Sequence, residues 1–186
     1  YDVALSKNVP LPIIEHIYHQ RGRALWKSKR YEEARDALTA FLKKYPQTAY
    51  RQAAIETIRD CTAVLIDQYN QSGDHLAATD LFLQGWKEGF IRPTDIDTLL
   101  KSSFSLSYVG LHEKALNMLN TLRKSASGKP PSYIEKIDAM AVEIEKNKAL
   151  GSSDQKLADV KWSHFQSSRE HLNANQPILA EKSLTD

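Results

Sequence analysis

The sequence contains few glycines, prolines and cysteines. Its 186 residues include seven glycines, seven prolines and one cysteine. So little glycine and proline argues against a turn-rich β-sandwich and against a disordered linker protein. The single cysteine, Cys61, has no partner for an internal disulfide, so the redox compartment stays open. Because Cys61 stands in the apolar stretch "IETIRDCTAVLI", we expect a buried, inert thiol rather than a nucleophile.

Long apolar runs and phosphate-binding loops are also missing. No run of about 18 apolar residues occurs, so the sequence predicts no membrane span. The glycines are scattered singly, and neither a Gly-rich phosphate loop nor a G-x-S-x-G motif is present. The chain begins at Tyr1 and ends on "PILAEKSLTD", which resembles the start of a helix. We therefore expect a piece of a longer protein, and a missing targeting segment carries no information.

Charge is balanced overall but unevenly distributed. The formal net charge of +2 gives no argument for nucleic acid or an anionic membrane. Residues 21–51 hold nine bases and three acids, whereas residues 56–97 hold eight acids and three bases. A basic segment followed by an acidic segment could serve to recognise a partner. We favour the simpler interpretation that solvated helix faces differ in charge.

Helical periodicity runs through nearly the whole chain, and alternating strand patterns are absent. Apolar residues make up 41% of the sequence, enough for a sizeable core. The sequence therefore predicts an all-α fold of about nine helices, joined in pairs by short loops. An extended entry over 1–12 precedes helices predicted over 13–26, 31–44, 49–71, 75–87, 95–108 and 112–124. Further helices are expected after Ser132, after Ser152 and from Asn175.

Several residues mark where these helices begin and end. Pro12 suits a helix N-terminus, where its missing N–H costs nothing, and Pro46 cannot continue the helix before it. Side chains that can accept a hydrogen bond from an exposed N–H precede the later helices. The predicted caps are Thr48, Asp74, Thr94 and Asn175, with capping boxes at Ser132–Glu135 and Ser152–Gln155.

Three segments align with one another and indicate an internal repeat. They are "QRGRALWKSKRYEEARDALTAFLKKYP", "AVLIDQYNQSGDHLAATDLFLQGWKEGF" and "KSSFSLSYVGLHEKALNMLNTLRKSAS". Each has a helix, a break, and a second helix that carries alanine (Ala34, Ala78 or Ala115) early on, which allows two helices to pack closely. Larger apolar residues follow that alanine and complete the packing: Leu38, Phe41, Phe82, Leu119 and Leu122. At the breaks, Gly73 and Gly110 supply the positive φ that such turns often require.

These residues resemble the tetratricopeptide repeat (TPR) family. The first repeat matches the family pattern with Gly22, Tyr31, Ala34 and Pro46. The second repeat matches it with Tyr69, Gly73, Ala78 and Phe82, and the third with Gly110 and Ala115. The spacings of 44 and 37 residues exceed the usual period of about 34, and the first-helix Trp and Leu are missing. The resemblance implies a right-handed α-solenoid of antiparallel helix pairs. The resemblance further implies a single domain over 13–186, with repeats at 13–46, 49–90, 94–126 and 132–173 and a further helix beginning over 175–186.

Few residues suggest chemistry. His16 and His19 are spaced to share a metal ion with Glu15 nearby, but no third ligand at matched spacing is visible and we favour surface histidines. Trp26, Trp86 and Trp162 could be ligand platforms, although packing between helices explains their spacing better. The basic residues are confined to the first pair, which argues against an RNA-reading repeat. We expect no catalytic set, no metal and no cofactor.

The TPR resemblance also implies a partner-binding surface on the first helix of each pair. Carried over residue by residue, it comprises His16, His19, Arg23, Trp26, Asp60, Asp67, Asn70, Gln71, Asp97, Phe104 and Tyr108. This mixture of charged, amide and aromatic groups suits an extended peptide, although each residue alone is also compatible with plain helix surface.

The sequence therefore predicts a non-enzymatic scaffold for a protein or peptide partner. "FLKKYPQTAYRQAA" also resembles TPR proteins of the bacterial envelope, which implies a periplasmic or envelope-associated role in assembly, secretion or a polysaccharide system. The alternative is a regulatory or sensor repeat domain attached to an enzyme outside this chain.

Overall fold

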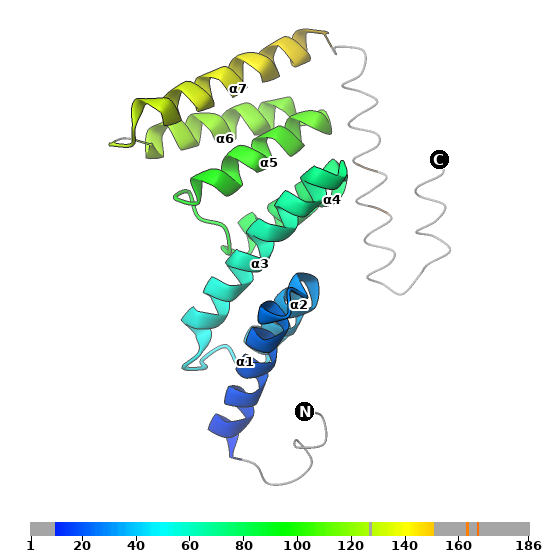
Figure 1. The fold of residues 1–186 in the computed structure, drawn as a ribbon, viewed down its shortest axis with the longest axis vertical. Coiled ribbons are helices and arrows are strands. Elements are labelled where there is room, and N and C mark those ends of the chain that lie inside the picture. Colours follow the sequence, from blue (N-terminus) through cyan, green and yellow to red (C-terminus); the bar gives the residue numbers. More distant parts are fainter. Residues whose placement is uncertain (1–9, 127, 151–162, 164–166, 168–186) are drawn as a thin grey trace. The chain divides into compact units, whose positions relative to one another are not determined.

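The computed structural model describes residues 10–126, 128–150, 163 and 167. Within this part the chain is helical and contains no strand, which confirms the predicted all-α class (Figure 1). Seven helices are described: α1 (Leu11–Lys27), α2 (Tyr31–Lys44), α3 (Arg51–Ser72), α4 (His75–Lys87), α5 (Ile96–Tyr108), α6 (His112–Ser125) and α7 (Pro131–Leu150). The helices and caps expected after Ser152 and from Asn175 lie outside the described residues.

The described chain divides into two compact units. The first comprises residues 10–68 and 81–92, and the second comprises residues 69–80, 93–126 and 128–150. The division falls within α3 and α4, so each of these helices contributes to both units.

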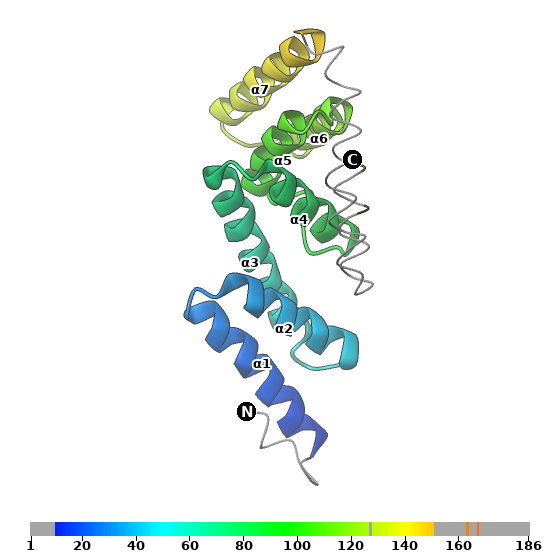
Figure 2. The same ribbon diagram turned by 90° about the vertical axis from the view of Figure 1, so that its right-hand side faces the viewer.

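In the first unit α1 and α2 form an antiparallel pair that lies side by side in two perpendicular views (Figures 1 and 2). Leu38 and Phe41 of α2 pack with Ile58 of α3 in the unit's hydrophobic core. A Cβ atom added to Gly22 would lie 2.4 Å from Leu38 side-chain carbons, so α1 approaches α2 at a point where only glycine fits. The close packing predicted for this pair is therefore present.

In the second unit α6 packs against both α5 and α7 (Figures 1 and 2). The side chains of Leu106, Leu119, Leu122 and Ile137 are almost completely buried there. Every alanine that the repeat pattern singled out is fully buried, and the larger apolar residues that follow it are at most 3% exposed. These residues are Ala34, Ala78, Ala115, Leu38, Phe41, Phe82, Leu119 and Leu122.

The same turn ends the first helix of each of the three pairs. The residue five positions before the buried alanine has positive φ, with values of 59° at Lys29, 81° at Gly73 and 84° at Gly110. In each turn the next residue donates its N–H to the carbonyl five positions back, at 3.0, 2.8 and 2.8 Å respectively. This is the hydrogen bond of a Schellman cap. The prediction for Gly73 and Gly110 is confirmed, and Lys29 adopts the same conformation although it has a side chain.

The start of α1 differs from the prediction. Leu11 and Pro12 belong to the helix instead of an extended entry. Proline is tolerated in a first helical turn, where its missing N–H would have no acceptor. The carbonyl of Pro10 accepts from the N–H groups of Ile13 and Ile14 at 2.9 and 3.2 Å, which starts the helix two residues earlier than expected.

The predicted caps divide into correct and incorrect ones. Asp74 caps α4, since its Oδ1 accepts from the N–H of Ala77 at 3.0 Å. Thr94 does not cap α5, whose N-cap position is Asp95 and has no side-chain cap bond. Ser132 lies inside the first turn of α7, because Pro131 begins that helix and thereby displaces the expected capping box.

Thr48 caps a turn rather than the helix itself. Its hydroxyl oxygen accepts from the N–H of Tyr50 at 3.3 Å, and α3 begins one residue later, at Arg51. The predicted helix start at residue 49 is therefore too early. The reason is that residues 49 and 50 form a turn before the helix.

Candidate partner-binding surfaces

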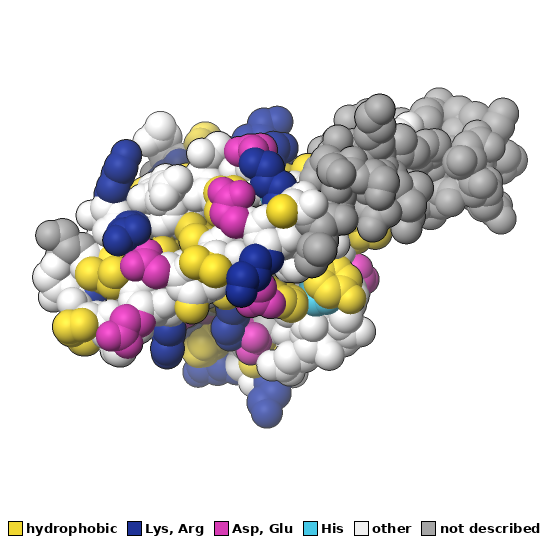
Figure 3. Space-filling view, turned by 90° about the horizontal axis from the view of Figure 1, so that it is seen from above, with side chains coloured by type: hydrophobic (Ala, Val, Ile, Leu, Met, Phe, Trp, Pro, Cys, Tyr) yellow, Lys and Arg dark blue, Asp and Glu magenta, His cyan; other side chains and the backbone are white. Residues whose placement is uncertain are grey.

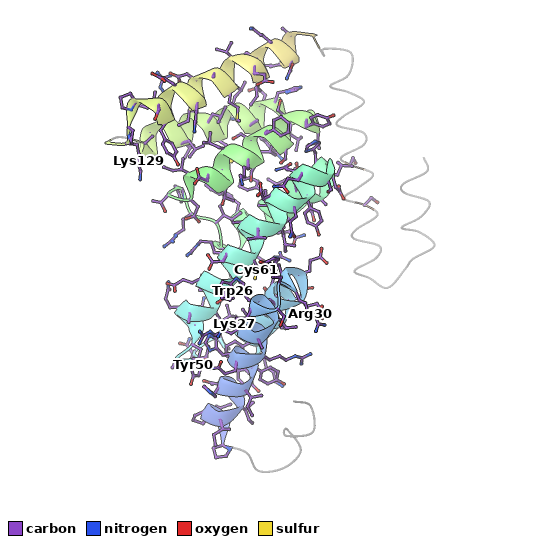
Figure 4. All side chains as sticks on the ribbon, in the orientation of Figure 1. Trp26, Lys27, Arg30, Tyr50, Cys61 and Lys129 are labelled. Carbon is purple, nitrogen blue, oxygen red and sulfur yellow. The ribbon has the colours of Figure 1, made fainter. Side chains whose placement is uncertain are left out.

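In the first unit, the predicted surface of α1 is anchored to the start of α3 by aromatic contacts. The Nδ1 atom of His16 lies 3.0 Å from the Tyr50 hydroxyl, and the His19 ring stacks on the Tyr50 ring at a centroid distance of 4.7 Å. Tyr50 stands in the turn just before the beginning of α3 (Figure 4). His16 is exposed, but His19 is only 4% exposed, so the expectation that both are surface histidines is wrong for His19.

The environment of His19 keeps its ring neutral. Neither ring nitrogen has a hydrogen-bond partner in the described part of the chain. Burial lowers the pKa of His19, and the charges of Arg23 and His16 lower it further. Glu15, the third member of the considered metal site, instead accepts a hydrogen bond from the Thr48 hydroxyl at 2.9 Å. Among the described residues, no group of three or more His, Cys, Asp or Glu side chains could hold a metal ion.

Further along α1, Arg23 and Trp26 are exposed. Figure 4 shows Trp26 beside Lys27 near the end of the helix. We expected packing between helices to explain both tryptophans. Trp26 is 36% exposed and Trp86 is 40% exposed, so packing covers only part of each side chain. Trp86 still contacts Phe82, with ring centroids 5.9 Å apart, while Trp162 lies outside the described residues.

A groove of about 440 Å³ lies between α1 and α2, away from the predicted surface. Its α1 side is formed by Tyr18, Arg21 and Leu25. These positions fall on the opposite side of the helix from His16 and Arg23, given a rotation of about 100° per residue. The groove therefore involves none of the α1 residues that the resemblance implied.

In the second unit, the structure brings several predicted residues together. Phe104 and Tyr108 lie one turn apart on α5, are 42% and 69% exposed, and have ring centroids 6.0 Å apart. His75, the first residue of α4, contacts both rings at centroid distances of 5.4 and 4.0 Å. The sequence analysis identified the two α5 aromatics but missed His75. We call His75, Phe104 and Tyr108 together with Asn70 the α5 aromatic site.

Asn70 determines which nitrogen of His75 carries the proton. Its Nδ2 donates to the carbonyl of Lys101 at 3.4 Å, so its Oδ1 is the atom that accepts from the Ser105 hydroxyl at 2.7 Å. The same Oδ1 lies 3.0 Å from Nδ1 of His75, which must therefore be the donor. Burial lowers the pKa of His75 and the Asp74 carboxylate partly opposes this, so Nε2 is an unprotonated acceptor at neutral pH.

A signal for His75 was present in the repeat. His75 and His112 both stand three residues before the buried alanine of their pair, and each contacts a polar side chain five residues earlier. The Nδ1 atom of His112 lies 3.2 Å from the Ser107 hydroxyl, just as His75 meets Asn70. Aligning the segments on their alanines would have singled out this position, which Tyr31 occupies in the first pair.

The remaining predicted residues occupy α3 and α5. Asp60 and Gln71 are exposed, and Asp67 is half-buried. Asp97 is exposed and accepts a hydrogen bond from the Tyr133 hydroxyl at 2.8 Å, which raises the pKa of Tyr133. Asp97 thus connects α5 to the first turn of α7.

Cys61 is fully buried, as expected. Burial, aided by the Asp60 charge, raises the pKa of its thiol to about 11. A thiol with so high a pKa is almost entirely protonated near neutral pH and is a poor nucleophile.

Charges of both signs are interspersed on the surface. Arg30 pairs with Glu33 and Lys148 pairs with Glu113, and all four side chains are well exposed. In Figure 3, hydrophobic side chains are scattered among Lys, Arg, Asp and Glu. None of the helices in the described residues combines the length and apolar character needed to cross a membrane.

The described chain is therefore an all-helical protein with helix pairs, repeated Schellman turns and exposed aromatic side chains on a first helix. No model of a known protein family, no curated protein and no solved structure matches it. The resemblance to the TPR family stays a prediction.

Proposed function

We propose that this chain is a non-enzymatic scaffold of stacked helix pairs that binds a partner protein or peptide through the first helices of its pairs. One observation carries the proposal. Phe104 and Tyr108 are exposed on α5, and buried groups behind them hold that part of the surface in place.

Exposure of this kind favours binding. Adjacent large aromatic side chains left in water are a feature of interaction sites, because their apolar area can be buried only by a partner. Tyrosine and tryptophan also dominate the binding energy of measured interfaces. Trp26, with Arg23 one turn earlier on α1, offers a second surface of the same kind in the first unit.

The bacterial envelope setting has no support beyond the stretch "FLKKYPQTAYRQAA" and stays a prediction.

Selection from a random peptide library against the whole chain tests the scaffold proposal. We expect selected peptides to bind in calorimetry. We expect Tyr108→Ala or Arg23→Glu to weaken the binding about tenfold, which corresponds to about 1.4 kcal/mol. Val142→Ala on α7 and Lys43→Glu on α2 are the controls, because the first shortens an exposed apolar side chain and the second reverses an exposed basic one, both away from the predicted surface.

The controls should change the dissociation constant less than about twofold, as rim and remote positions usually do. The proposal is wrong if no peptide is enriched, or if the control variants lose as much affinity as the two surface variants.

A further inference from the structure

The α5 aromatic site has features that a generic peptide surface does not need. It presents two exposed aromatic side chains, a largely buried neutral imidazole, and a half-buried amide that fixes the orientation of that imidazole. Each feature limits the chemistry of what can bind there.

The rings provide a stacking surface. The Tyr108 ring centroid lies 4.0 Å from that of His75 and 6.0 Å from that of Phe104, so the three rings form one contiguous cluster. The negative faces of aromatic rings attract cations, and a planar cation gains additional stacking contact.

The imidazole provides a hydrogen-bond acceptor. Since Asn70 accepts from Nδ1 of His75, Nε2 carries a lone pair. No group in the described residues is hydrogen-bonded to this Nε2. His75 is 9% exposed and its ring lies against that of the exposed Tyr108, so a ligand's donor would approach Nε2 from the Tyr108 side.

The two segments that build the site carry more acids than bases. Residues 69–80 and 93–108, which build the site, contain four acids and one base: Asp74, Asp80, Asp95, Asp97 and Lys101. The carboxylate of Asp74 adjoins His75 in the chain and partly opposes the lowering of that imidazole's pKa by burial. A negative field beside aromatic faces favours a cationic ligand over an acidic or neutral one.

From these features we infer that the α5 aromatic site recognises an arginine side chain of the partner, with its guanidinium stacked on Tyr108 and donating to Nε2 of His75. Arginine fits better than lysine, because its planar guanidinium both stacks on rings and offers several N–H donors in fixed directions. This inference rests on the proposed scaffold function and specifies one residue of the ligand.

The experiment is an NMR titration of the whole chain with N-acetyl-arginine amide. N-acetyl-citrulline amide, which has the same shape without the charge, and N-acetyl-lysine amide serve as comparison ligands. We expect saturable shifts in the resonances of His75, Phe104 and Tyr108, including Nε2 of the imidazole. Affinity for the arginine compound should exceed that for the other two at least about threefold.

Variants of an exposed residue separate ring recognition from folding. Tyr108→Phe keeps a ring and should retain binding, whereas Tyr108→Leu keeps apolar area without a ring and should weaken binding about fivefold. Val142→Ala should leave the titration unchanged. Equal binding of citrulline, shifts confined to other residues, or wild-type affinity in Tyr108→Leu would each overturn the arginine assignment.

The two proposals fail in different ways. If library peptides without arginine bind and still depend on Tyr108, the scaffold function stands and the arginine assignment is wrong. If arginine amide binds as expected but no peptide is enriched, the site recognises the amino acid and the scaffold function is wrong.

Discussion

Lys29 shows how one residue departs from the repeat without changing the backbone. Its φ of 59° lies in the left-handed region, where Gly73 and Gly110 stand in the other two turns. A side chain in this conformation costs about 1–2 kcal/mol, because the Cβ atom approaches the following carbonyl oxygen. The hydrogen bond from the N–H of Arg30 to the carbonyl of Leu25 maintains the turn nonetheless.

Replacing Lys29 with glycine should therefore stabilise the protein. We expect Lys29→Gly to raise the free energy of unfolding by about 0.5–1 kcal/mol. Glycine relieves the backbone strain of the folded state, but part of this gain is lost because glycine makes the unfolded chain more flexible. Gly110→Ala should lower it by about 1 kcal/mol or more. Urea denaturation measures both changes, with Ala24→Gly at an exposed interior position of α1 as a destabilising control. A destabilised Lys29→Gly protein would contradict this account of the turn.

At the scale of the element, Gly22 sets how closely α1 and α2 pack. Glycine inside a helix ordinarily destabilises it by roughly 0.5–1 kcal/mol relative to alanine. Here the added methyl group would meet Leu38 at 2.4 Å, and Leu38 belongs to the hydrophobic core. The close approach of two helices outweighs the helix propensity of one position.

The sign of the Gly22→Ala effect distinguishes these two influences. We expect Gly22→Ala to lower the free energy of unfolding by about 1–3 kcal/mol, because the added methyl group overpacks the core. At an exposed helix position the same substitution would instead raise the free energy of unfolding. Leu38→Ala alone should cost about 2–5 kcal/mol through the cavity it leaves. The double variant should lose less than the sum of the two, since the new methyl group fills part of that cavity. A Gly22→Ala protein more stable than wild type in thermal unfolding would exclude the clash.

At the scale of the whole molecule, neutral histidines are part of the folded structure in both units. Burial lowers the pKa of His19 in the first unit and of His75 and His112 in the second, all below the ordinary value of 6.5. His19 faces the charges of Arg23 and His16, whereas Asp74 acts on His75, and Lys148 and Glu113 act on His112. Protonation therefore opposes folding at all three sites.

The stability of the chain should fall as the pH drops below about 6.5. The unfolded chain then binds protons that the folded histidines do not, so the free energy of unfolding decreases with falling pH. Glu33 and Glu113, whose pKa values are lowered by Arg30 and Lys148, add to this loss only as the pH nears their ordinary value of 4.5.

Urea denaturation at several pH values between about 7.5 and about 5.5 isolates the histidine effect from the carboxylates. His19→Phe should flatten the pH dependence, and the double variant with His75→Phe should flatten it more. Stability that is constant over this range, or a slope unchanged in the double variant, would contradict the expectation.

Much of the fold could be predicted because its signals are local. The apolar periodicity predicts α2 and α4 with their observed ends, and Pro46 and Gly73 mark breaks through their own backbone preferences. The buried alanines also follow from sequence, since each holds a constant place after its turn. Phe104 and Tyr108 were predicted as surface residues through the repeat resemblance and are exposed.

Only the tertiary structure decided which side chains meet across different helices. His19 is buried because Tyr50, which follows it by 31 residues, stacks on its ring, and His75 joins Phe104 and Tyr108 across a similar separation. The backbone preference of a residue depends on that residue and its near neighbours in the chain, so the local sequence predicts it. Burial, tautomer and pKa depend on neighbours that become adjacent only when helices pack, so no local pattern determines them.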